Sequence, residues 1–168
     1  MHFTVDANMH PYCLDRIIKF YWELSLTIDT EKKIEYADSP PPHNSPDRKA
    51  YEPITTLDTL IYLYTASKDL KDDLLSASVL AKLRHNLHHG YFELDEFLGS
   101  IRLVYGMDML NENNRLVQKM FLSAATIHSL SLSAGEKRTL FHDLQRQIQR
   151  FGQEYSLAMS WRMHVWKA

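Results

Sequence analysis

Apolar side chains recur every three or four residues along most of the chain, which is the spacing of one face of an α-helix. The first stripe begins after Asn8, and Pro11 suits the first turn of a helix because its missing N–H needs no partner there. Further apolar residues lie off this stripe, so we expect a helix that is central or contacts a second surface. The stripe consists of Leu14, Ile17, Ile18, Tyr21, Leu24 and Ile28, and the off-stripe residues are Phe20, Trp22 and Leu26.

Prolines interrupt the helical pattern between residues 30 and 53. Five of the six prolines of the chain lie in this stretch, with Asp, Ser and Asn residues between them. Proline lacks a backbone donor and disfavours helix in the residue before it. We therefore predict an extended or disordered Pro-rich loop over 30–53. The run 39–42 has the composition of a polyproline ligand, but a flexible connector is the preferred interpretation.

Helical spacing returns after the loop and predicts four or five more helices. Gly90 and Gly106 are expected to end two of them, and Ser133 and Glu136 have the spacing of a capping box that would begin the last. Whether the first two segments form separate helices or one bent helix is open. The segments are 54–66, 67–89, 92–105, 111–130 and a final one that runs from the capping box towards Trp166.

Composition supports the same fold class. Leucines outnumber valines by more than four to one, and unbranched side chains lose little rotamer freedom in a helix. The length of 168 residues is close to that of one ordinary domain. We therefore predict an all-α protein: a single helical domain over 1–168, built as an irregular bundle of five or six helices with the Pro-rich loop after the first.

The charge balance and the cysteine content disfavour several classes of protein. With 19 basic and 21 acidic residues the net charge is −2, which gives no electrostatic case for non-specific nucleic-acid binding. The C-terminal part is locally basic, so a nucleic-acid-binding regulator remains a weaker alternative. The single cysteine, Cys13, excludes an internal disulfide framework. No apolar run is long enough for a membrane span, and residues 1–8 do not resemble a secretory signal, so we expect a cytoplasmic protein.

The histidine turn is the clearest candidate for metal chemistry. His85 and His89 are four residues apart in a predicted helix, so they share a face with the spacing of zinc-binding helices. Acidic residues at 93, 95 and 96 could supply oxygen ligands. This pattern gives one alternative function, a small metal-dependent helical hydrolase. The competing interpretation is structural, because histidines near a helix C-terminus can bond its last carbonyls.

Other catalytic signatures are absent from the sequence. It contains neither a Gly-x-Ser-x-Gly turn nor a glycine-rich phosphate loop. We therefore favour a non-enzymatic protein over an enzyme and expect no cofactor.

The C-terminal segment 155–166 carries two apolar faces on one predicted helix. Trp, Met and Arg are enriched among the residues that dominate protein interfaces. The alternative is that this helix simply completes the core. The preferred hypothesis is a non-enzymatic interaction module, such as an adaptor, chaperone, inhibitor or regulatory subunit, whose partner is another protein or a second copy in a homodimer. The candidate partner-binding residues are Tyr155, Met159, Trp161, Arg162, Met163 and Trp166.

Overall fold

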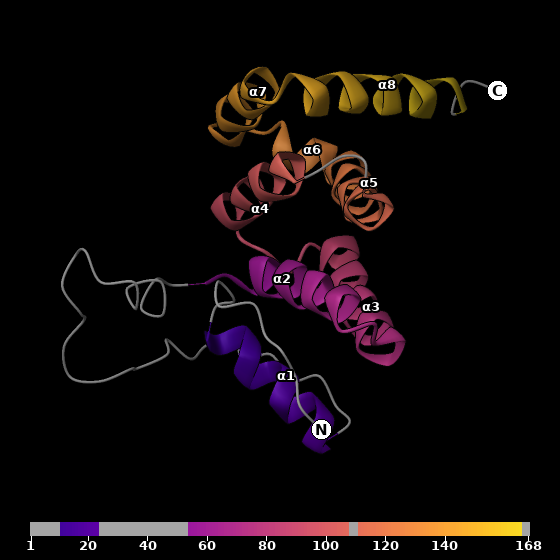
Figure 1. Cartoon of the computed structure of the whole chain (residues 1–168). Helices are drawn as coiled ribbons and strands as arrows, with labels where there is room; N and C mark the ends of the chain where they lie inside the picture. Colours follow the sequence, from indigo (N-terminus) through magenta and orange to yellow (C-terminus); the bar gives the residue numbers. More distant parts are fainter. Residues whose placement is uncertain (1–10, 24–53, 108–110, 166–168) are drawn as a thin grey trace, which may run out of the picture. The chain divides into compact units, whose positions relative to one another are not determined.

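A computed structural model of the chain describes residues 11–23, 54–107 and 111–165, and in these ranges the chain forms eight helices and no strand (Figure 1). The all-α prediction is therefore confirmed. The predicted Pro-rich loop over 30–53 lies outside the described residues. The helices are α1 (Pro11–Glu23), α2 (Thr56–Asp69), α3 (Asp73–His89), α4 (Leu94–Gly106), α5 (Glu112–Ile127), α6 (Ser129–Leu132), α7 (Lys137–Gln147) and α8 (Gln149–Val165).

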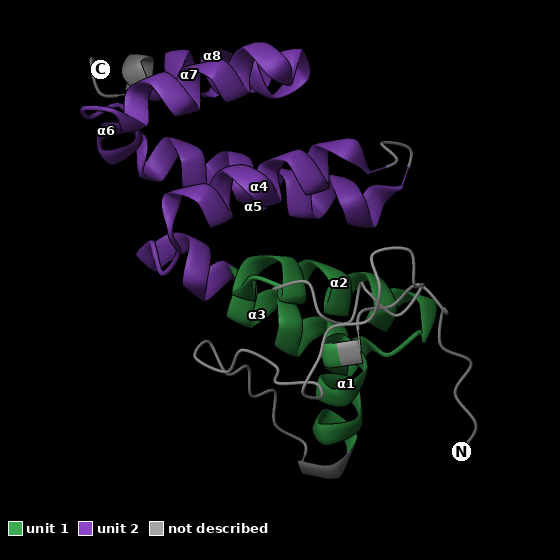
Figure 2. Cartoon of the chain, turned by 90° about the vertical axis from the view of Figure 1, so that its left-hand side faces the viewer, with its two compact units in different colours: residues 1–83 green, residues 84–168 purple. Residues whose placement is uncertain are grey.

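The chain divides into two compact units, residues 1–83 and 84–168, which Figure 2 colours separately. Each is described by itself below, and the single domain over 1–168 stays a prediction. None of the described helices is both long enough and apolar enough to cross a membrane.

The first unit is built on the contact between α1 and α2. Cys13 is fully buried, and this burial raises the pKa of its thiol to about 12, so the sulfur is an inert core group rather than a nucleophile. The Tyr21 hydroxyl donates to the Asp72 carboxylate, which also accepts from the backbone N–H of Leu75 at 2.8 Å and so caps α3. Asp72 therefore ties α1 to the start of α3. Two separate helices form, but the break lies between Asp69 and Asp73, where Lys71 has φ 54, so residues 67–69 belong to α2 rather than to the second predicted segment.

The second unit holds an aromatic core between α4, α5, α7 and α8. Phe121 stacks on Phe97, and Phe151 meets Phe141 edge to face at 5.9 Å between ring centroids. Gly90 ends α3 with φ +71, as the sequence predicted. A Cβ there would also lie 3.1 Å from the His128 ring, which is a tight contact, so glycine is favoured on two grounds.

The predicted capping box between Ser133 and Glu136 is wrong. Ser133 ends the short helix α6, and Glu136 precedes α7 without a side-chain capping bond. The capping box that does form joins Glu93 and Glu96 at the start of α4. Gly135 between α6 and α7 has φ +54, so the chain turns at the position where the sequence predicted the first turn of a helix.

Eight helices replace the expected five or six because two of the predicted segments are divided. The segment 111–130 is divided at His128, between α5 and α6. The final segment is divided at Ile148, whose φ of −112 and ψ of 78 are not helical. Gly152 makes this second break possible, because a Cβ at that position would lie only 2.6 Å from the carbonyl oxygen of Gln145.

Candidate functional site

The predicted partner-binding residues on α8 fall into three groups. The ring of Tyr155 is 8% exposed and packs edge to face on Phe141 at 5.1 Å, so it belongs to the core. Met159 is half-buried, whereas Arg162 is exposed and Trp161 is 66% exposed. Trp166 and the side chain of Met163 lie outside the described part of the chain.

A groove of about 250 Å³ runs between α5 and α8. Trp161 forms part of it together with Leu157, one turn earlier and 61% exposed. Two large apolar side chains therefore stand side by side in water on α8, next to a concave surface. The groove is lined by Arg115, Gln118, Lys119, Leu122, Arg150, Glu154, Leu157, Ala158 and Trp161.

A chain of polar contacts crosses the base of this groove. The amide of Gln118, 1% exposed, donates to the carbonyl oxygen of Val104 at 2.7 Å and accepts from Arg150 Nη2 at 3.0 Å. Arg150 Nε donates to one carboxylate oxygen of Glu154 at 3.1 Å, and the hydroxyl of Tyr105 donates to the other at 2.8 Å. These contacts join α4, α5 and α8, so the groove has a preorganised floor.

The sequence analysis missed this network. Arg150 and Glu154 have the spacing of a helical ion pair, which was an available signal. Gln118 and Tyr105 lie 32 and 49 positions away from their partners, and no local pattern links them.

The surroundings of Tyr105 keep its hydroxyl protonated. Burial, and then the hydrogen bond to Glu154 and its charge, raise the pKa of Tyr105 well above its usual value. The phenol therefore remains a donor at neutral pH. The guanidinium of Arg150 also lies over the Tyr105 ring, 5.5 Å from its centroid. Among the buried side-chain nitrogen and oxygen atoms of the described residues, its Nη1 atom is the one without a hydrogen-bond partner.

The groove has two chemically different ends. Arg150, in the first turn of α8, contacts Gln118 of α5, and Arg162, near the end of α8, donates to the carbonyl oxygen of Thr126, near the end of α5. The two helices therefore run in the same general direction along the groove. Its cations lie towards the helix starts, and its exposed apolar pair lies further along α8.

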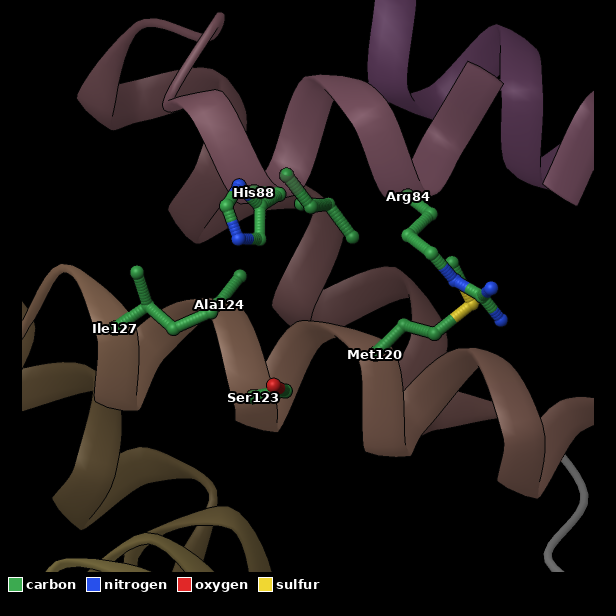
Figure 3. Close-up of a pocket in the computed structure, with 7 residues that line it drawn as sticks. Arg84, His88, Met120, Ser123, Ala124 and Ile127 are labelled. Carbon is green, nitrogen blue, oxygen red and sulfur yellow. The ribbon is translucent and has the colours of Figure 1, made fainter. Parts of the chain in front are cut away.

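A second hollow, of about 200 Å³, lies between the end of α3 and α5 (Figure 3). Arg84 and His88 reach from α3 towards Met120, Ala124 and Ile127 on α5. Leu87 and Ser123 complete the lining. The hollow is mostly apolar with two basic side chains from one helix.

The histidine turn keeps the predicted geometry but gains no further ligand. The rings of His85 and His89 lie 4.5 Å apart, and the ring of Tyr91 stacks on His89 at 5.5 Å. Across the described ranges no three or more His, Cys, Asp or Glu side chains are grouped to hold a metal ion. Glu93 and Glu96, which the sequence offered as oxygen ligands, instead form the capping box of α4. The metal site at His85 and His89 stays a prediction.

Comparison with known proteins gives no match, whether with family models, with curated protein sequences or with solved structures. The function is therefore inferred from the residues of the chain.

Proposed function

We propose that this chain is a protein-interaction module that holds a segment of another protein in the groove between α5 and α8. The observation that carries the proposal is the exposure of Leu157 and Trp161, one turn apart, at the edge of a concave surface. No catalytic group is needed for this role. It fits an adaptor, chaperone, inhibitor or regulatory subunit.

Binding energetics favour these two side chains as anchors. Covering apolar surface contributes roughly 25 cal/mol per Å², and tryptophan is among the residues that most often dominate an interface. The anchors stand on a helix fixed by the Gln118–Arg150–Glu154 network. Because that helix is already ordered, binding a partner costs little further ordering of the module.

The proposal is tested by selecting randomised peptides of about sixteen residues against the whole chain. We expect selected peptides to bind the unchanged protein and to lose affinity at least about thirtyfold on Trp161→Ala, the loss of roughly 2 kcal/mol that marks a dominant interface residue. Leu157→Ser should weaken the same peptides.

The matched control is Leu130→Ser, because Leu130 is a leucine on α6 that is 89% exposed and does not line the groove. It should leave binding unchanged, and circular dichroism should show all three variants folded. Peptides that bind Trp161→Ala as well as the unchanged chain, or a selection that yields no binder, would contradict the proposal.

A further inference from the structure

We propose that the groove selects an acidic amphipathic segment, in which a carboxylate pairs with the cationic end and a large apolar side chain covers Leu157 and Trp161. This inference rests on the proposed function, because it names the chemistry of the partner at the same groove. Both ends of the groove would then be used by one ligand.

The charges that line the groove do not balance. Arg115, Lys119 and Arg150 contribute three positive charges, and Glu154 is the single carboxylate among the lining residues. Glu154 already accepts from Arg150 and Tyr105. Two positive charges are left over, on a chain whose net charge is −2. A partner that supplies a negative charge is therefore complementary to the groove and not to the chain as a whole.

Arg150 adds hydrogen-bond donors without a partner to this cationic end of the groove. It lies in the first turn of α8, where the helix dipole disfavours a cation and favours an anion. Its Nη1 donors are buried without a partner, which leaves part of the desolvation penalty of the guanidinium uncompensated. A carboxylate that enters beside Arg150, with a small shift of the side chains around it, would satisfy these donors by charge-assisted hydrogen bonds.

The spacing along α8 defines the segment. Leu157 is seven residues beyond Arg150, which is about 10 Å along a helix axis, and Trp161 is one turn further. A helical partner that lies along the groove therefore needs an acidic residue and a large apolar residue about seven positions apart. That is the pattern of an amphipathic helix that docks one face into a groove.

Two other occupants have different chemistry. A nucleic acid would need a longer cationic track than three side chains with a carboxylate among them. A second copy of the chain would make the same groove self-complementary and would appear as a dimer. Both are outcomes of the test below.

The test uses the peptides selected against the whole chain. We expect Asp or Glu to be enriched about seven positions from the apolar anchor, and replacing that residue by Asn or Gln to weaken binding about tenfold. On the double variant Arg115→Gln, Lys119→Gln the preference for the acidic peptide should decrease, because Arg150 is the one cation of the groove lining that remains to pair with the carboxylate. Both changed residues are exposed, so this variant keeps the core intact. In the Arg150→Lys variant the preference for the acidic over the amide peptide should also decrease, because lysine keeps the positive charge but lacks the paired N–H donors of the guanidinium.

The outcomes separate the two proposals. Loss of all binding on Trp161→Ala with no acidic preference would overturn the inference and leave the proposed function standing. Peptide binding that is unaffected by Trp161→Ala would overturn both proposals. Concentration-dependent dimers in sedimentation that Trp161→Ala abolishes, or displacement of the peptide by a single-stranded oligonucleotide, would overturn the inference in favour of another occupant. An acidic preference that decreases on the double variant supports it.

Discussion

The two faces of α8 have similar composition and opposite environments. Phe151 and Tyr155 are buried against α7, whereas Leu157 and Trp161 stand in water. All four are large apolar residues within eleven positions of one helix. The comparison shows that composition does not distinguish the buried residues of α8 from its exposed ones, whereas the contacts with α7 do.

The largest effect is expected from truncating a side chain on the buried face of α8. Phe151 is fully buried and contacts Phe141, Tyr105 and Tyr155. We expect Phe151→Ala to lower the free energy of unfolding by about 3–5 kcal/mol, through lost transfer energy and the cavity left behind. Urea unfolding followed by circular dichroism measures this. A loss below about 1 kcal/mol would mean that α8 does not depend on this face.

A change at the break itself should have the next largest effect. In Gly152→Ala the new methyl group would meet the backbone of Gln145, which cannot move like a flexible side chain. We expect a destabilisation of about 1–3 kcal/mol together with weaker peptide binding, because α8 would shift.

Gly99→Ala is the matched control for that change. Gly99 lies inside α4, and nothing stands within 4 Å of the added Cβ. This variant should be neutral or more stable by up to about 1 kcal/mol. An equal loss of stability in both variants would show that the close approach of Gly152 to Gln145 does not determine the effect of the substitution.

The network beneath the groove gives a smaller, pH-dependent effect. Tyr105→Phe removes the donor to Glu154 and should cost about 1 kcal/mol at neutral pH. The raised pKa of Tyr105 in the folded state means that its stabilisation is present below pH 10, its usual pKa, and is lost as the pH rises towards the folded value. Urea midpoints between pH 9 and 11 should therefore fall less steeply in Tyr105→Phe than in the unchanged chain. Parallel curves would contradict the buried hydrogen bond.

Local signals predicted much of the fold. Helical spacing found the segments, and Gly90 ended α3 as its conformational freedom suggests. The capping box failed because the Ser133 and Glu136 pattern is local, whereas the chain there follows the turn at Gly135 between α6 and α7. Contacts set by the tertiary arrangement override a short motif of this kind.

The candidate site was predictable only in outline. The sequence predicted Trp161 and Arg162 as partner-binding residues and predicted two apolar faces on the helix. It gave no reason to separate Tyr155 from the other candidate residues. That separation depends on the packing of Tyr155 against Phe141 of α7, and the groove floor depends on the contact between Arg150 and Gln118 of another helix. Neither contact has a signature in local spacing.

The most direct test of the interaction module measures stability and binding on the same sample of Trp161→Ala. Because Trp161 is mostly exposed, the unfolding free energy of the Trp161→Ala variant should stay within about 0.5 kcal/mol of that of the unchanged chain. The affinity for selected peptides should fall at least about thirtyfold. A variant that unfolds, or one that binds as tightly as before, would show that the exposed face of α8 is not a partner surface.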